Sequence, residues 1–319
     1  MEILKVKDLK IYFKTGGKEL RAVDGVSFSL FDGEALGLVG ESGCGKTTTA
    51  LSIMRLLPQN GRIAQGEIIF QGEDLIKKSD KDIRKVRWKD ISIIFQGAMN
   101  ALNPVITVGE QIKEAILLHD QADENEARRR VKELFEFVEL DKKRVRQYPH
   151  EFSGGMRQRV MIAMALACRP KIIIGDEPTT ALDVMVQSQV FELIGKLRAE
   201  LGMSMILITH DLSVLSETCE RVAVMYGGKI LECGRIEELY SNPMNPYTSM
   251  LLSSFPDISK EKRMPSSIPG LPPGLINPPE GCRFHPRCPH ALEICRKEEP
   301  AIEFITETHS YACHRGGAY

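Results

Sequence analysis

Short runs of branched apolar residues alternate with longer, partly polar stretches along most of the chain. The apolar runs have the length of buried strands and lie at Ala35–Val39, Ile91–Phe95, Ile172–Ile174, Met205–Ile208 and Val222–Tyr226. Stretches that predict helices lie between them, at Lys46–Leu57, Arg157–Ala167 and Val186–Leu201. This alternation predicts an α/β fold whose core is a parallel sheet.

Two segments depart from this pattern. Residues 2–13 and 20–30 look like strands joined by a turn at Thr15-Gly16-Gly17, which predicts an N-terminal antiparallel β-subdomain. Residues 107–140 instead show helical spacing, with apolar positions at Val131, Leu134, Phe135 and Val138 and with the i,i+4 charge pairs Glu124/Arg128 and Glu126/Arg130. They predict a helical subdomain inserted over about 97–160.

Proline marks a boundary towards the C-terminus. Ten of the 17 prolines lie between Pro256 and Pro300, and the stretch Pro265–Pro279 can hold neither a helix nor an interior strand. We therefore expect a compact domain over 1–255 and, over 256–319, a Pro-rich tether with a small, irregular Cys-rich region.

Charge and hydropathy exclude several classes of protein. The 42 Lys and Arg against 43 Asp and Glu argue against a blanket of phosphate contacts, so no nucleic-acid partner is expected. The longest apolar run, Val160–Cys168, has nine residues, whereas a membrane-spanning helix needs roughly 20. The N-terminus lacks the apolar stretch of a secretory signal. These features predict a cytosolic chain without disulfides.

The strand at Ala35–Val39 is followed by a complete G-x-x-x-x-G-K-[ST] pattern from Gly40 to Thr47. Glycines let successive N–H groups point at phosphate oxygens, and the following helix N-terminus adds positive charge. Lys46 would reach the β- and γ-phosphates and Thr47 would bind Mg²⁺. The context favours ATP binding over a glycine-rich turn with an incidental lysine. The predicted nucleotide contacts are Gly40, Ser42, Gly43, Cys44, Gly45, Lys46, Thr47 and Thr48.

Cys44 inside this loop has two interpretations. A helix N-terminus lowers a thiol pKa, so Cys44 could block nucleotide binding when oxidised. The favoured interpretation is a small side chain tolerated where the backbone binds the ligand.

A second acidic site follows the strand at Ile172–Ile174. Asp176 and Glu177 at a strand end point to opposite faces, so Asp176 suits Mg²⁺ and Glu177 suits the general base that activates water. Alone, such an end is typical of a solvated turn. Downstream of a phosphate loop, it favours a catalytic role.

The order of these motifs resembles that of ATP-binding cassette (ABC) ATPases, with a P-loop core. One segment is similar to the signature motif of that family, namely Phe152-Ser153-Gly154-Gly155-Met156-Arg157-Gln158-Arg159. The resemblance also covers Gln96 after a strand, Ala181-Leu182-Asp183, and His210-Asp211. It implies that Gln96 contacts Mg²⁺ and the attacking water, and that His210 contacts the γ-phosphate.

The resemblance also implies a dimer that encloses two ATP molecules. Ser153, Gly154 and Gly155 would close over ATP held by the other subunit, and Ala181–Asp183 would cross the interface. An aromatic residue near the N-terminus would stack on adenine. Phe13 is the first choice for that residue and Tyr12 the second.

Other strings look like the ATPase subunits of dipeptide and oligopeptide importers. They are residues 95–104, residues 176–184, Asn245-Pro246-Tyr247-Thr248, and residues 281–289. The resemblance implies a peripheral position on the cytoplasmic side of the membrane. It implies as partners a second, paralogous cassette subunit, two transmembrane permease subunits and an extracellular peptide-binding protein. The alternatives are importers of nickel or another small solute, a soluble non-transport ABC ATPase, and a metal-binding regulatory protein that retains the cassette.

Four of the eight cysteines fall in the last 38 residues, at Cys282, Cys288, Cys295 and Cys313. A bound metal would stabilise so short and Pro-rich a region. Zinc sites usually use C-x2–4-C pairs, which are absent here, so a [4Fe–4S] cluster is favoured over Zn²⁺ and over unligated thiols. With zinc, the further candidate ligands are His285, His290, His309 and His314.

Overall fold

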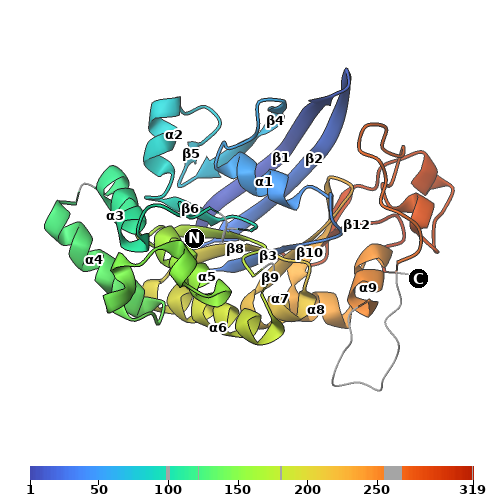
Figure 1. The fold of residues 1–319 in the computed structure, drawn as a ribbon. Coiled ribbons are helices and arrows are strands. Elements are labelled where there is room, and N and C mark those ends of the chain that lie inside the picture. Colours follow the sequence, from blue (N-terminus) through green and yellow to red (C-terminus); the bar gives the residue numbers. More distant parts are fainter. Residues whose placement is uncertain (98–100, 121, 180–181, 255–267, 318) are drawn as a thin grey trace. The chain divides into compact units, whose positions relative to one another are not determined.

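The computed structural model describes residues 1–97, 101–120, 122–179, 182–254, 268–317 and 319 (Figure 1). The chain divides into two compact units. The first comprises Met1–Leu30, Ala35–Ile76 and Ile208–Tyr319, and the second comprises Phe31–Glu34 and Lys77–Leu207. The predicted boundary at 255 lies outside the described residues, and the C-terminal region belongs to the same unit as the phosphate loop.

An antiparallel sheet forms the N-terminal part of the first unit. Its order is β2-β1-β4-β5, with bounds β1 (Glu2–Thr15), β2 (Lys18–Phe31), β4 (Gly61–Phe70) and β5 (Glu73–Asp74). Gly16 and Gly17, at φ 55° and 76°, form the tight turn between β1 and β2, since such hairpin turns need positive φ. The predicted antiparallel subdomain is thereby confirmed.

A second group of strands in this unit runs in the order β11-β12-β10-β9-β3. The bounds are β3 (Ala35–Val39), β9 (Arg221–Tyr226), β10 (Lys229–Arg235), β11 (Ile302–Phe304) and β12 (Ser310–Ala312). Strands β3 and β9 are parallel and every residue in them is buried, as expected of continuous apolar runs. Strand β12 pairs with β10, so the C-terminal region extends this sheet. The sequence did not predict that pairing.

Short helices connect these strands. They are α1 (Lys46–Ile53), α7 (Leu212–Thr218), α8 (Ile236–Ser241), α9 (Pro246–Ser253), and the 3₁₀ turns η4 (His285–Arg287) and η5 (Ile294–Arg296). Asn245 caps α9 through its side chain, and Pro246 takes the first helical position, which needs no backbone donor.

The second unit contains β6 (Ile91–Ile94), β7 (Ile172–Asp176) and most of β8 (Ser204–Ile208), in the order β8-β7-β6. Strands β6 and β7 are parallel, with Ile91 opposite Ile172. The helices are α2 (Asp80–Val86), α3 (Val108–His119), α4 (Glu124–Phe137), α5 (Gly154–Ala165) and α6 (Val184–Leu201), with the 3₁₀ turns η2 (Lys142–Arg146) and η3 (Pro149–Glu151).

Helix α4 buries the apolar face that its spacing predicts, with Val131, Leu134 and Phe135 inside. One predicted charge pair on it is wrong. Arg130 is nearly buried and pairs with Asp120, before the helix, instead of with Glu126. A buried guanidinium needs a partner for its charge, and an ion pair with a carboxylate that is also shielded from water is stronger than one with an exposed carboxylate. An exposed i,i+4 ion pair contributes little to the stability of the fold.

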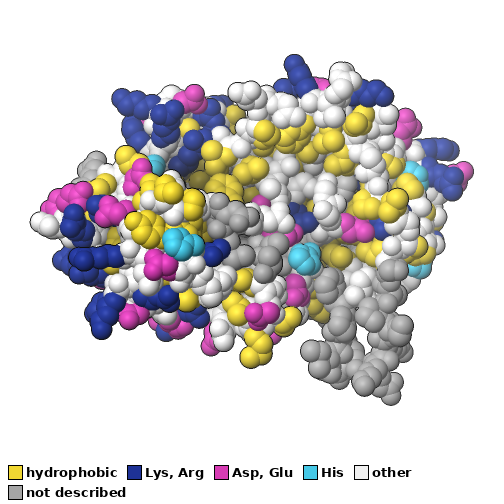
Figure 2. All heavy atoms as spheres, viewed as in Figure 1, with side chains coloured by type: hydrophobic (Ala, Val, Ile, Leu, Met, Phe, Trp, Pro, Cys, Tyr) yellow, Lys and Arg dark blue, Asp and Glu magenta, His cyan; other side chains and the backbone are white. Residues whose placement is uncertain are grey.

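No helix within the described ranges is both long and apolar enough to span a bilayer. On the face shown in Figure 2, basic and acidic side chains are interspersed, and they form no continuous basic surface. This distribution agrees with the near-neutral charge of the chain.

Candidate functional site

The phosphate loop lies between β3 and α1 and depends on glycine at two points. Gly40 has φ 150°, and a Cβ there would come within 2.0 Å of the Met225 carbonyl oxygen. Gly45 has φ 108°, and a Cβ there would lie 2.5 Å from the Ala22 carbonyl oxygen. Any larger residue would therefore displace the loop from the strands behind it.

Lys46 is held by the loop itself. Its side chain is buried, and Nζ donates to the carbonyl oxygens of Gly40, at 2.6 Å, and Glu41, at 3.1 Å. No acidic residue occupies the first turn of α1, which leaves the helix N-terminus positive. Ser42 and Thr47 are exposed and Thr48 is half-buried. A buried ammonium group and an uncompensated helix end suit an anionic ligand.

Cys44 is almost fully buried, and this burial raises the pKa of its thiol. Its Sγ lies 3.6 Å from Lys46 Nζ. A protonated, inaccessible thiol is a poor nucleophile. The environment favours the interpretation of Cys44 as a small packing residue.

The two candidate adenine-stacking residues have different surroundings. Phe13 lies opposite Gly61 on β4, where a Cβ would come within 2.6 Å of the Phe13 ring. Tyr12 donates from its hydroxyl to Asp24 Oδ1 at 3.1 Å, and the Arg62 guanidinium lies 5.7 Å from its ring centroid. Adjacent strand residues face opposite sides, so only one of the two rings can face a bound base.

In the second unit, Gln96 and Glu177 lie together. Strands β6 and β7 are parallel neighbours, so the segments after their carboxyl ends meet, and Gln96 Nε2 donates to Glu177 Oε2 at 2.7 Å. Asp176, the last residue of β7, is buried, whereas Glu177 is half-buried. The two acids therefore differ in environment, as expected of consecutive residues at a strand end.

The signature segment begins α5. Ser153 caps this helix by accepting from the Met156 N–H, and no acidic residue lies in the first turn. Ser153 is exposed, and Gly154 and Gly155 are half-buried. A Cβ on Gly155 would come within 2.7 Å of Val186 Cγ1, so this glycine allows α5 and α6 to approach closely. The exposed helix start can accept an anion.

Two further predicted positions lie at helix starts. Asp183 caps α6, where its Oδ1 accepts from the Val186 N–H at 3.0 Å. His210 is exposed, directly before the Asp211 that caps α7 in the first unit. Ala181 and residues 98–100 of the importer-like string lie outside the described residues.

The structure brings the four C-terminal cysteines to one small cavity. Cys282, Cys288, Cys295 and Cys313 all line it. Burial, together with the electrostatic effect of the other three thiols, raises the pKa of Cys282 to about 11. Within the described ranges, no three or more His, Cys, Asp or Glu side chains are grouped as a single metal ion requires. The four thiols thus lie at one cavity, but they form no single-ion site among the described residues.

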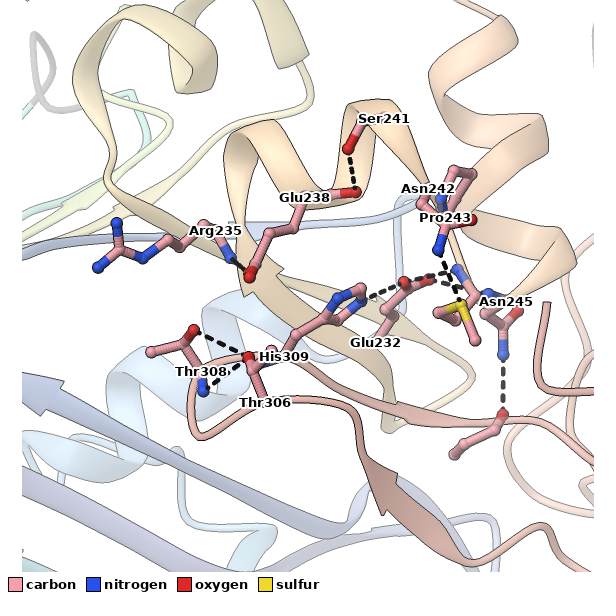
Figure 3. Close-up of polar contacts among 12 residues, drawn as sticks. Glu232, Arg235, Glu238, Ser241, Asn242, Pro243, Asn245, Thr306, Thr308 and His309 are labelled. Atoms are coloured by element: carbon pink, nitrogen blue, oxygen red, sulfur yellow. Dashed lines mark hydrogen bonds and ion pairs between the residues drawn. The ribbon is translucent and has the colours of Figure 1, made fainter.

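Three histidines line this cavity, and two of them bond to the backbone, whereas the ring of His290 lies 5.2 Å from that of Tyr319. His285 Nδ1 lies 3.0 Å from the Cys282 carbonyl oxygen, and His314 Nε2 lies 3.0 Å from the Glu298 carbonyl oxygen. His309 lies elsewhere, beside Glu232 of β10, with 2.8 Å between its Nε2 and Glu232 Oε1 (Figure 3).

Known families match both parts of the chain. The ABC transporter family matches residues 23–180, and the family described as oligopeptide/dipeptide transporter, C-terminal region, matches residues 231–295. The chain is 48% identical to the oligopeptide transport ATP-binding protein OppD of Bacillus subtilis, over 96% of this chain and 87% of that protein. It is 42% identical to the dipeptide transport ATP-binding protein DppD of Escherichia coli, over 98% and 97%.

A solved structure supports the same assignment. The dimeric ATP-binding cassette MJ0796, in a post-hydrolysis state bound to ADP and Pi, matches with a TM-score of 0.66 and 28% identity, over 73% of this chain and 98% of that one. The predicted α/β cassette fold is confirmed. The chain therefore belongs to the family of ABC transporter ATP-binding proteins and is an ABC ATPase with an oligopeptide/dipeptide-type C-terminal region.

Proposed function

We propose that this chain is the ATP-hydrolysing subunit that energises a dipeptide or oligopeptide importer. The supporting observation is that relatives with such names share 42–48% identity with almost the whole chain, including the C-terminal region. That region favours peptides over nickel or another small solute as the cargo. It likewise favours a transport ATPase over a soluble, non-transport ABC ATPase.

In the first unit, we propose that the loop from Gly40 to Thr48 binds the phosphates of ATP. Lys46 neutralises the β- and γ-phosphates, and its burial strengthens that interaction. Phe13, or else Tyr12, stacks on adenine, and His210 contacts the γ-phosphate. Thr47 would bind Mg²⁺ through its hydroxyl.

In the second unit, we propose Glu177 as the general base. Its carboxylate would accept a proton from water. The Gln96 side-chain amide, whose Nε2 lies 2.7 Å from Glu177 Oε2, would orient the carboxylate and the water. The buried carboxylate of Asp176 and the Gln96 side-chain oxygen are the hard ligands that Mg²⁺ prefers, and they would bind it in this unit. When bound, Mg²⁺ neutralises charge on the phosphates.

We propose that two cassettes close over ATP. Ser153, Gly154 and Gly155 at the start of α5 would bind the γ-phosphate of ATP held by the other subunit, with Asp183 at the interface. Hydrolysis would remove that bridge and let the dimer open. The partners would be a paralogous cassette, two permease subunits and an extracellular peptide-binding protein, at the cytoplasmic side of the membrane.

We further propose that the four C-terminal cysteines bind a [4Fe–4S] cluster, with Zn²⁺ as the alternative. The support is that all four thiols line one cavity.

Reconstitution tests the transport function. The chain, its partner cassette and the permease subunits would be placed in proteoliposomes with the binding protein, and uptake of labelled di- to pentapeptides would be measured. We expect uptake that requires ATP and is abolished by Lys46→Ala, whereas the exposed Arg296→Ala keeps it. Uptake of nickel but not of peptides would contradict the proposal.

A further inference from the structure

A C-terminal arginine forms an ion pair with the phosphate loop. Arg287 Nη1 lies 2.6 Å from Glu41 Oε2 and its Nη2 lies 3.0 Å from Glu41 Oε1, so the two side chains form a two-pronged ion pair. The Arg287 side chain is only 5% exposed and that of Glu41 is 25% exposed. Such paired, charge-assisted bonds are the strong ones in proteins, and burial reduces their screening by salt.

The remaining donors of Arg287 are also used. Its Nε donates to the Pro269 carbonyl oxygen at 2.8 Å, and its Nη2 donates to those of Ile268 and Gly270, each at 3.2 Å. Its Nη1 also donates to the Tyr226 hydroxyl at 3.2 Å. These bonds hold the guanidinium in the orientation in which it pairs with Glu41.

The backbone of Glu41 is held from the same side. Its N–H donates to the hydroxyl of Tyr247 at 3.1 Å, and Tyr247 is fully buried. The ring of Tyr247 packs against Tyr226 and Phe284, at centroid distances of 4.7 and 5.2 Å. Phe284 and Arg287 both lie between Cys282 and Cys288, so this Cys-flanked segment supports the back of the phosphate loop.

A second arginine of this segment reaches the N-terminal hairpin. Arg283 pairs with Asp24 and donates from Nη1 to the Gly227 carbonyl oxygen at 3.1 Å. Asp24 also accepts from the hydroxyl of Tyr12. The C-terminal region thus contacts the phosphate loop directly, and it is linked through Asp24 to Tyr12.

We propose that Arg287 is a positioning residue of the nucleotide site, through which the C-terminal region sets the affinity for ATP. Glu41 carries a negative charge in a loop that must accept the negative phosphates. Arg287 neutralises that charge and fixes the loop from behind. Without Arg287, the free carboxylate repels the phosphates, and more strongly for ATP than for ADP because ATP carries more charge.

Equilibrium binding of fluorescent ATP and ADP analogues to the purified full-length chain tests this inference. We expect Arg287→Ala to weaken ATP binding about tenfold, and ADP binding less. Glu41→Gln removes the repelling charge, so it should bind ATP no more weakly than the wild type. The double variant should recover most of the affinity that Arg287→Ala loses.

Matched variants keep the test decisive. Arg296→Ala removes an exposed arginine of the same region and should leave the affinity unchanged. If Arg287→Ala unfolds at a much lower temperature without nucleotide, the ATP affinities of Arg287→Lys and of the double variant are compared with that of the wild type instead. We expect Arg287→Lys to lose less ATP affinity than Arg287→Ala. Wild-type affinity in Arg287→Ala, or no recovery in the double variant, would overturn the inference. None of these readouts involves transport, so they stand apart from the test of cargo.

Discussion

Glu177 has a backbone conformation that few residues other than glycine adopt. Its φ is 46°, directly after the last residue of β7, and this turn places its carboxylate beside Gln96 while Asp176 remains buried in the strand. Strain of this kind persists where the surrounding structure enforces it, often at functional sites.

The residue-scale prediction concerns this carboxylate. Glu177→Gln keeps the size and a hydrogen-bonding oxygen but cannot accept a proton, so we expect ATP hydrolysis to fall by about 10²- to 10⁴-fold while ATP still binds. Hydrolysis rates and size-exclusion chromatography with MgATP check this, since the variant should accumulate as a closed dimer. Glu192→Gln, an exposed acid on α6, is the control. Undiminished hydrolysis in Glu177→Gln would refute the role of general base.

Single residues were predictable from sequence only where a local pattern surrounds them. The phosphate loop and the Asp176-Glu177 pair each lie between an apolar run and a helix or turn. Arg287 and Glu41 are 246 positions apart, and neither stands in a pattern that indicates its partner. Their pairing depends on the tertiary fold, which no spacing along the chain encodes.

At the scale of elements, β10 and α9 hold the C-terminal region. Glu232 on β10 is fully buried and accepts from the backbone N–H groups of Met244 and Asn245, at 2.8 and 3.0 Å. Asn245 then donates from its side chain to the carbonyl oxygen of Ala312 on β12 at 2.8 Å. One buried polar network therefore joins β10 to β12 (Figure 3).

Asn245→Ala should weaken this junction. The change removes the cap of α9 and leaves the Ala312 carbonyl oxygen without that donor, which together cost about 2–3 kcal/mol. We expect an earlier unfolding midpoint in urea and faster proteolysis of the C-terminal region. The exposed Asn277→Ala should change neither. A wild-type midpoint for Asn245→Ala would show that the network adds no stability.

Element prediction succeeded where burial decides the conformation. Continuous apolar runs predicted β3, β6, β7, β8 and β9, and the spacing of Val131, Leu134 and Phe135 predicted the inner face of α4. Strands β11 and β12 were missed because each has three residues and all three residues of β11 are exposed. The pairing of β12 with β10 and of β11 with β12, and not local propensity, makes them strands.

In the intact molecule, we expect the cavity lined by the four C-terminal cysteines to hold iron. A preparation made without oxygen should be brown and hold about four iron atoms per chain. Because burial raises the pKa of Cys282 to about 11, its thiol must lose a proton on loading, so reconstitution with iron and sulfide should improve between pH 7 and pH 9. Metal analysis and absorbance measure both.

Cysteine variants provide the control for that measurement. Cys288→Ser should lose iron, whereas Cys168→Ser, a buried cysteine of the second unit, should retain it. A colourless chain without iron would exclude the cluster, and a chain with zinc instead would favour the alternative.

The addition of β12 to β10 has a consequence for solubility. Without residues 310–312, β10 would present unpaired N–H and C=O groups along one side, which is a template for joining other chains into aggregates. With them, the outermost strand is β11, three residues long and interrupted by the charged Glu303. A cassette shortened at 254 would thus lose its protection against self-association as well as the four C-terminal cysteines.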